Sequence, residues 1–233
     1  MTKPSARYQG DRGGDYFAEA GRFSGAQDFG RIWQARIFAP YCGPDRTVLD
    51  FGCGDGTILR AVPAQRRLAV EVNPYCLEKI NLRNAGLTPP IVTREQLSAW
   101  ENCIADVVIS NHALEHVLDP YNSLLEMRRV LRPEGVLVLV TPFDDWRATG
   151  QRKWTSNDKQ NHLYTWSPTN IGNLLTEAGF QVQRSCLRST AWSPKIFWVQ
   201  RLFGSAVFSA TCSLLASLLV RREVLSVASR PRE

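Results

Sequence analysis

Apolar residues along the chain follow two alternating patterns. Residues 74–85 and 121–131 carry apolar side chains at helical spacing, and a further helical stretch at 28–41 comes earlier in the chain. Short runs that are apolar at nearly every position, as expected for buried strands of a parallel sheet, occur at 47–51, 68–72, 91–93, 104–110 and 135–141. This alternation predicts right-handed crossovers and a doubly wound α/β fold, in which helices cover both faces of a parallel sheet.

The composition is that of one globular domain. The chain has 233 residues, of which 44% are hydrophobic and 21% charged, enough for one well-buried core. The net charge of +6 would suit an anionic partner, but the Lys and Arg residues are scattered, which favours a solvated basic surface. Six cysteines without a Cys-x-x-Cys pair are expected to be reduced, and residues 1–14, a flexible lead-in, show no secretory signal. These features predict a cytoplasmic protein.

The most informative motif follows the first expected strand. Asp50 ends the apolar run, and glycines follow at positions 52, 54 and 56. Glycine permits positive φ and close approach of a ligand, and such turns in open α/β sheets bind cofactors. The dinucleotide pattern Gly-x-Gly-x-x-Gly would place its third glycine at Thr57, one position later than it stands here. The Asp50 carboxylate would suit an ammonium group, which S-adenosylmethionine (SAM) has and NAD lacks.

A second acid stands at the end of the next expected strand. Glu71 follows the glycine turn by roughly 20 residues, the distance at which such folds place an acid that accepts hydrogen bonds from ribose hydroxyls. An exposed glutamate at a strand end is the alternative. The glycine turn at the matching distance favours the ribose.

Together with segments 105–120, 124–142 and 161–180, these residues make the chain resemble the class I SAM-dependent methyltransferases of the small-molecule type. The resemblance implies one domain with a seven-stranded Rossmann-like sheet. Its last strand, here 223–229, would be antiparallel and lie beside the fifth.

The resemblance also implies which residues contact SAM. The methionine end would lie beside the turn, the ribose on Glu71, and the sulfonium beside the end of the fourth strand. Many relatives place an acid after the third strand to contact the adenine; residues 93–94 take that position here, and no adenine contact is assigned. The implied cofactor residues are Asp50, Gly52, Cys53, Gly54, Glu71, Asn111 and His112, with Tyr16 in a segment that closes over the cofactor.

All three histidines of the chain, His112, His116 and His162, fall in segments that border the expected site. Methyl transfer to a hydroxyl requires removal of a proton, and histidine suits that role near neutral pH. A hydrogen-bonded structural imidazole is the alternative for each. We assign the base, or the group that orients the acceptor, to His162, with His112, His116 and Glu115 as further catalytic candidates.

The run His112-x-x-Glu115-His116 also matches the inverted zinc-protease motif. That motif must lie within a helix, whereas here it begins directly after a buried strand, so a protease is discounted. Related quinone-pathway O-methyltransferases hold a divalent metal with carboxylates and histidine in this loop. Because His112 stands where they have an acid, a hard cation is not favoured, and the protein is expected to need no metal.

Residues 190–222 form an apolar helical insertion between the expected sixth strand, 181–187, and the seventh. Residues 204–220 carry no charge, as in a transmembrane helix. A spanning helix would, however, prevent the following strand from returning to the sheet. An amphipathic helix is expected instead, covering the acceptor pocket, resting on a membrane surface through 196–220, or packing against the domain or a second subunit. Its apolar stripe, opposite serines 205, 209, 213 and 217, is Phe203, Val207, Phe208, Thr211, Leu214, Leu215, Leu218 and Leu219.

The sequence therefore predicts a SAM-dependent methyltransferase that acts on the oxygen of a small or lipid-linked acceptor, such as a glycan sugar or a quinone precursor. A non-catalytic SAM-binding or scaffold protein is the first alternative. An RNA methyltransferase would suit the positive charge, but neither an RNA-binding module nor an Asn/Asp-Pro-Pro-Tyr motif is present, so nucleic acid is not expected as a partner. The expected location is the cytoplasm, at the inner face of the membrane if the insertion docks there. The oligomeric state is not predicted.

Overall fold

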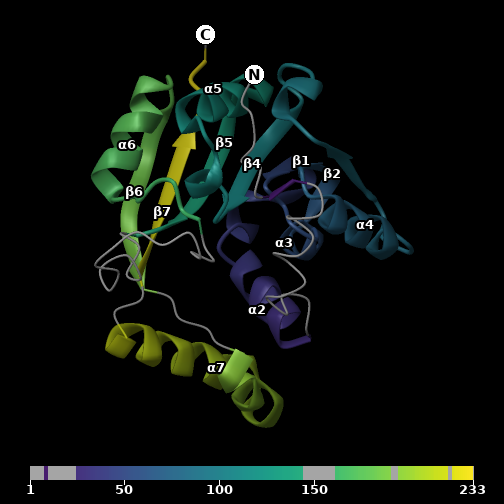
Figure 1. The fold of residues 1–233 in the computed structure, drawn as a ribbon, viewed down its shortest axis with the longest axis vertical. Coiled ribbons are helices and arrows are strands. Elements are labelled where there is room, and N and C mark those ends of the chain that lie inside the picture. Colours follow the sequence, from purple (N-terminus) through teal and green to yellow (C-terminus); the bar gives the residue numbers. More distant parts are fainter. Residues whose placement is uncertain (1–7, 10–24, 144–160, 190–193, 220–221, 233) are drawn as a thin grey trace.

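Seven strands form one sheet in the computed structural model, which describes residues 8–9, 25–143, 161–189, 194–219 and 222–232 (Figure 1). The strand order is β3-β2-β1-β4-β5-β7-β6. The strands are β1 Gly43–Phe51, β2 Ala64–Val70, β3 Ile91–Arg94, β4 Ala105–Asn111, β5 Leu131–Pro142, β6 Gln181–Ser189 and β7 Arg222–Ser229.

The direction of the last strand sets β7 apart from the others. Strands β1 to β5 pair in parallel, whereas β7 runs antiparallel to both of its neighbours, β5 and β6. This confirms the predicted seven-stranded Rossmann-like sheet. β1 and β5 begin earlier than predicted, at Gly43 and Leu131, because their first residues are mostly polar and pair irregularly, so the apolar pattern does not mark them.

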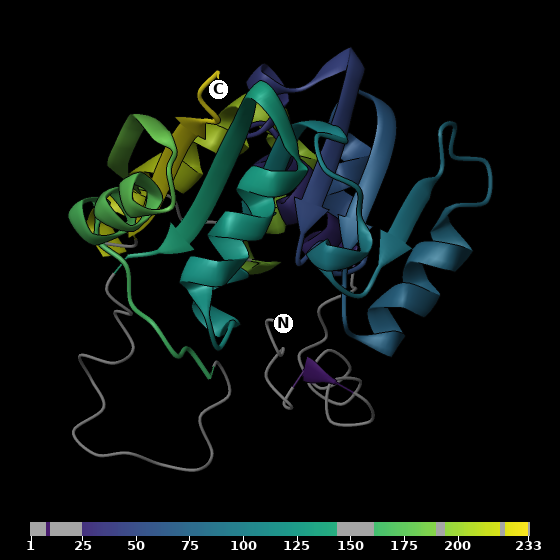
Figure 2. The same ribbon diagram turned by 90° about the horizontal axis from the view of Figure 1, so that it is seen from above.

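Helices cover both faces of the sheet, as predicted (Figure 2). Three of them begin where the sequence places a capping side chain directly before a proline: Asn73 caps α4, Asp119 caps α5 and Ser167 caps α6. The helices are α2 Gly25–Ala35, α3 Thr57–Ala61, α4 Pro74–Arg83, α5 Pro120–Val130, α6 Pro168–Glu177 and α7 Phe197–Leu219, with short 3-10 turns η2 Ala39–Tyr41, η3 Leu97–Ala99, η4 Leu114–His116 and η6 Pro194–Ile196.

The core has two halves, one on each face of the sheet. Successive residues of β1 alternate between them, since Val48 packs with α2, α3 and α4 while Leu49 packs with α5 and α6. Both side chains are fully buried. The alternation is the period of two that a strand requires, and burial on both faces explains why these runs contain so few polar residues.

The insertion between β6 and β7 is helical, as predicted, but its buried side includes only part of the predicted stripe, Phe208 among its members. Phe208, Cys212 and Ala216 are buried, whereas Leu214 and Leu218 of the predicted stripe are more than 60% exposed. The indole Nε1 of Trp33 in α2 donates a hydrogen bond to Ser209, on the side predicted to be polar. The prediction failed because periodicity alone could not tell which side of so apolar a helix meets α2.

The ring of Phe208 should hold α7 against α2. It is 1% exposed, and its centroid lies 5.1 Å from that of Phe29 and 6.0 Å from that of Trp33, edge-on in both cases. We expect Phe208→Ala to lower the free energy of unfolding by about 3 kcal/mol, measured by denaturant titration. Leu214→Ala, on the exposed side of the same helix, is the matched control and should change it little. Equal effects of both would contradict this packing.

Candidate functional site

The turn after β1 depends on its glycines. Gly52, Gly54 and Gly56 all have positive φ, at 72°, 56° and 74°. A β-carbon on Gly52 would come within 2.4 Å of the β-carbon of Ala113, which lies after β4, whereas one on Gly54 would meet nothing within 4 Å. Gly52 is therefore required by packing between two loops. Gly54 leaves its side of the turn open to a ligand.

Glu71 ties this turn to the end of β2. Its carboxylate accepts hydrogen bonds from the backbone N–H groups of Gly54 at 2.7 Å and of Val72 and Asn73 at 2.9 Å each. Burial raises the pKa of Glu71 to about 7, although these three hydrogen bonds work in the opposite direction. Each carboxylate oxygen can accept more than one hydrogen bond, so the predicted contact with ribose hydroxyls is compatible with these bonds and stays a prediction.

The carboxylate of Asp50 is buried without a hydrogen-bond donor or an ion-pair partner among the described residues. It is 2% exposed, and none of the described residues donates a hydrogen bond to its carboxylate or pairs with it. Burial, and secondarily the charge of Glu71, raise its pKa to about 8. Burying an unpaired carboxylate is costly, and a bound cation would relieve that cost. An ammonium group beside Asp50, as SAM would supply, fits this requirement.

Cys53 and Asn111 are two further predicted cofactor residues that the structure describes. Cys53 is buried within the turn. The side-chain oxygen of Asn111, the last residue of β4, is buried, and among the described residues it has no hydrogen-bond donor. A buried acceptor in this state is expected to meet a ligand or water. Tyr16, predicted to close over the cofactor, lies outside the described residues.

His112 lies between two buried acids. Its Nδ1 is 3.5 Å from Glu115 Oε1 and its Nε2 is 3.6 Å from Glu223 Oε2, in β7. Burial opposes a charge on His112, but the two carboxylates outweigh it and raise the pKa to about 10. The imidazole is therefore protonated at neutral pH and does not suit the role of base that the sequence left open for it.

Glu223 is a site residue that the sequence analysis did not identify. It is 2% exposed and also lies 3.6 Å from Arg188 of β6. A signal existed, since it is the first acid after Glu177 and stands directly before the apolar pair Val224 and Leu225. The contact with His112 could not be inferred, because the two residues come from strands on opposite sides of β5.

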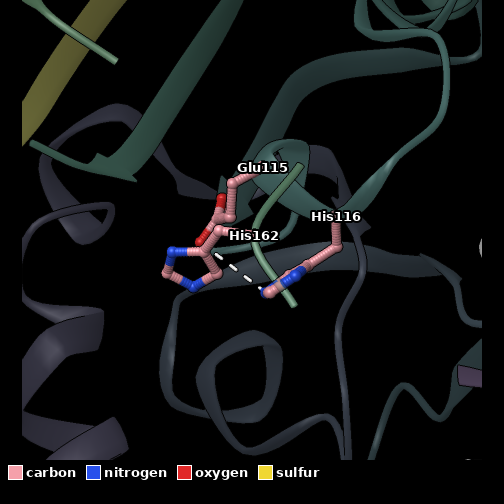
Figure 3. A group of neighbouring side chains, drawn as sticks. All are labelled: Glu115, His116 and His162. Atoms are coloured by element: carbon pink, nitrogen blue, oxygen red, sulfur yellow. Dashed lines mark ion pairs between the residues drawn. The ribbon is translucent and has the colours of Figure 1, made fainter. Parts of the chain in front are cut away.

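The other two histidines lie together around Glu115 (Figure 3). Glu115 and His116 belong to η4, whereas His162 precedes α6; the ring centroids of the two histidines are 4.9 Å apart. Glu115 is fully buried, and its Oε1 is 3.8 Å from His116 Nε2. The backbone N–H of Leu163 donates to the Glu115 carbonyl at 2.8 Å, which fixes the His162 segment against η4. The structure thus gathers all three predicted histidines around one carboxylate.

Protonation differs within this group. Burial lowers the pKa of His116, so its ring is neutral near pH 7. Burial alone would raise the pKa of Glu115, but His112 and His116 outweigh it and keep the carboxylate ionised. A neutral imidazole beside a fixed negative charge can accept a proton, because the carboxylate stabilises the imidazolium that forms.

Tyr8 was also missed by the sequence analysis. Its hydroxyl is 2.8 Å from His116 Nδ1, and its backbone carbonyl accepts a hydrogen bond from the side chain of Asn73 at 3.0 Å. Tyr8 therefore links the end of β2 to the histidine group. No motif marked it, because only the fold brings it near residues more than sixty positions away.

Glu115, His116 and His162 could also hold a metal ion, since one potential ligand atom from each lies within 4.8 Å of the others. Two imidazole nitrogens and one carboxylate suit a transition metal or zinc better than magnesium. The predicted metal independence stays a prediction.

Comparisons with known proteins agree with this geometry. A family model described as a methyltransferase domain matches residues 27–185. A malonyl-[acyl-carrier protein] O-methyltransferase of Halorhodospira halophila is 28% identical over 58% of this chain and 48% of its own length, and a ubiquinone biosynthesis O-methyltransferase of Histophilus somni is 29% identical over 42% and 45%. The chain spans about half the length of these curated relatives.

Solved structures share the fold. Geranyl diphosphate C-methyltransferase from Streptomyces coelicolor A3(2), in complex with Mg²⁺, geranyl diphosphate and S-adenosyl-L-homocysteine, aligns with a TM-score of 0.61. The match covers 97% of this chain and 86% of that one at 17% identity. At this identity, the likeness concerns the fold alone.

Asp50 should make the ligand-free protein less stable as pH rises. Its ordinary pKa of 3.8 becomes about 8 on folding, so the folded state holds this proton more tightly than the unfolded state does. The stability that this proton contributes is therefore lost as the pH rises from about 4 to about 8. We expect Asp50→Asn to reduce the loss of unfolding free energy between pH 5 and pH 8, measured by denaturant titration without ligand. Asp45→Asn, at an exposed position of β1, is the control. A loss identical to that of the wild type would contradict an uncompensated Asp50.

Metal independence can be tested directly at the group of Glu115, His116 and His162. We expect dialysis against EDTA to leave S-adenosylhomocysteine affinity and methyl transfer unchanged, because the group has charge partners among its own side chains. Calorimetric titration and transfer of a radiolabelled methyl group are the measurements. Activity that is lost with EDTA and restored by added magnesium, manganese or zinc would overturn this expectation.

Proposed function

The chain belongs to the methyltransferase-domain family, and from this premise we propose that it transfers the methyl group of SAM to a hydroxyl oxygen of a small or lipid-linked acceptor. The matched residues 27–185 include β1 to β5 and most of β6, and so all the described residues that we assign to the cofactor. The sequence prediction of a SAM-dependent methyltransferase with a Rossmann-like fold is confirmed at the level of the family.

The described residues fit SAM as the cofactor. Asp50 would hold the ammonium group, Gly54 would allow close approach of the methionine end, and Glu71 would hold the ribose. The burial of the Asp50 carboxyl group, with no partner among the described residues, supports this assignment most directly. SAM supplies a methyl group already activated by its sulfonium, so the protein must align the acceptor and receive its proton.

One observation supports oxygen as the atom that receives the methyl group. His116, His162 and the ionised Glu115 lie together at the carboxyl edge of the sheet, beside the glycine turn. A hydroxyl acceptor loses a proton on methylation, and a neutral imidazole suits its removal. Both curated relatives described above are O-methyltransferases by name, which supports the same choice.

We propose that His162 removes the proton of the acceptor hydroxyl and that His116 positions His162. Both ring nitrogens of His116 face partners within the protein, Nδ1 the hydroxyl of Tyr8 and Nε2 the carboxylate of Glu115. His162 packs against this ring from a separate segment. Glu115 then stabilises positive charge on the pair.

The acceptor is proposed to be a sugar hydroxyl or a quinone precursor. Exposed apolar side chains of α7, on the insertion between β6 and β7, support a lipid-linked molecule. β6 ends at the same edge of the sheet as β4, so the insertion leaves the sheet on the side of the histidine group.

Replacement of His162 tests the proposal. We expect His162→Ala to lower kcat for methyl transfer to a polyprenyl catechol or another hydroxylated acceptor by about 10²- to 10⁴-fold. The affinity for S-adenosylhomocysteine should be unchanged, because His162 is not assigned to the cofactor. Thr165→Ala, at an exposed position of the same segment, should retain activity.

Two outcomes would count against this assignment. Near-normal turnover of His162→Ala would remove its role as the base. Binding of S-adenosylhomocysteine by the wild type without transfer to any hydroxylated acceptor would favour a non-catalytic SAM-binding protein.

A further inference from the structure

One side of α7 is apolar and uncovered by the described residues. Figure 1 shows the helix at the margin of the molecule, with α2 between it and the sheet. Its inner side packs on α2 through Phe208. The outer apolar side chains are exposed by 46% to 70%: Trp198, Leu202, Phe203, Val207, Leu214 and Leu218. We call these six residues the outer face of α7.

The charges of the chain segment that carries the outer face have one sign. No Asp or Glu occurs between Glu177 and Glu223, whereas the same stretch contains six Lys or Arg residues. Lys195 and Arg201 are exposed at the beginning of the helix, and Arg222 is exposed at the end of the insertion. Arg36 of α2 contacts the same helix through Ser209.

This combination fits an anionic membrane better than a second copy of the chain. An interfacial helix inserts apolar side chains among lipid chains, while nearby Lys and Arg residues contact the anionic headgroups. Two copies that met through this face would bring like charges together, which is unfavourable. We propose that the outer face of α7 docks on an anionic lipid surface.

The helix lies on the surface and does not cross the membrane. By length and composition it is long and apolar enough to span. It breaks, however, at Gly204, which has φ 79° and ψ −179°, and the arm that follows measures roughly 22 Å, shorter than a hydrocarbon core of about 30 Å. The two ends of the insertion also return to the same place, since Ser189 pairs with Arg222.

The insertion that carries this face returns to the sheet beside the candidate site. Glu223 follows Arg222 directly, and its carboxylate lies 3.6 Å from His112. A lipid-linked acceptor could therefore reach the histidine group from the bilayer. This consequence rests on the proposed function, whereas membrane binding itself does not.

Vesicle sedimentation of the full chain tests the proposal. We expect binding to phosphatidylcholine vesicles that contain phosphatidylglycerol, weaker binding to phosphatidylcholine alone, and weakening with salt. The double variant Leu214→Ser and Leu218→Ser should weaken binding by roughly tenfold to a hundredfold, because two exposed leucines lose contact with lipid. Leu82→Ser with Val92→Ser, at exposed apolar positions of α4 and β3 and not of α7, is the matched control and should bind like the wild type.

The remaining outcomes would overturn the proposal. Failure of the wild type to sediment with either kind of vesicle is one, and equal binding by the wild type and the Leu214 and Leu218 variant is another. A dimer in analytical ultracentrifugation that this variant dissociates, without any vesicle binding, would make the outer face a subunit interface. Affinity for S-adenosylhomocysteine, measured alongside, shows that the variants are folded. Transfer to a water-soluble hydroxyl acceptor tests the proposed function independently of lipid.

Discussion

Burial of carboxylates at the carboxyl edge of the sheet is the constraint on which the candidate site depends. Asp50, Glu71, Glu115 and Glu223 are each less than 10% exposed, although burying an ionised carboxylate is costly. Each is compensated differently. Three backbone N–H groups satisfy Glu71, and His112 lies between Glu115 and Glu223. The Asp50 carboxylate has no partner among the described residues, and it is therefore the acid with which a cationic ligand would pair.

The same residue type serves different purposes within a few ångströms. His112, between two carboxylates, is held as a cation, whereas burial keeps His116 neutral. The difference follows from the number of acids that each ring faces: His112 contacts Glu115 and Glu223, and His116 contacts only Glu115 among them. A chain with three histidines can in this way provide both a fixed positive charge and a proton acceptor.

The insertion and the site share one edge of the sheet because β7 is antiparallel. β6 ends and β7 begins at that edge, so the chain leaves for α7 and returns beside the carboxyl ends of β4 and β5. Glu223 takes part in both, standing at the end of the insertion and against His112. The insertion that carries the proposed lipid surface thereby leaves and rejoins the sheet beside the proposed acceptor site.

The sequence by itself determined the alternation of strands and helices, the glycine turn and the family resemblance, because these depend on local spacing and on backbone conformations that particular residues allow. It also located the three histidines near the site. Only the tertiary structure decided that Glu223 and Tyr8 contact them, that His112 is charged, and which side of α7 is buried. Those outcomes depend on distances between residues far apart in the chain, and a burial or a charge pair has no local signature in a sequence.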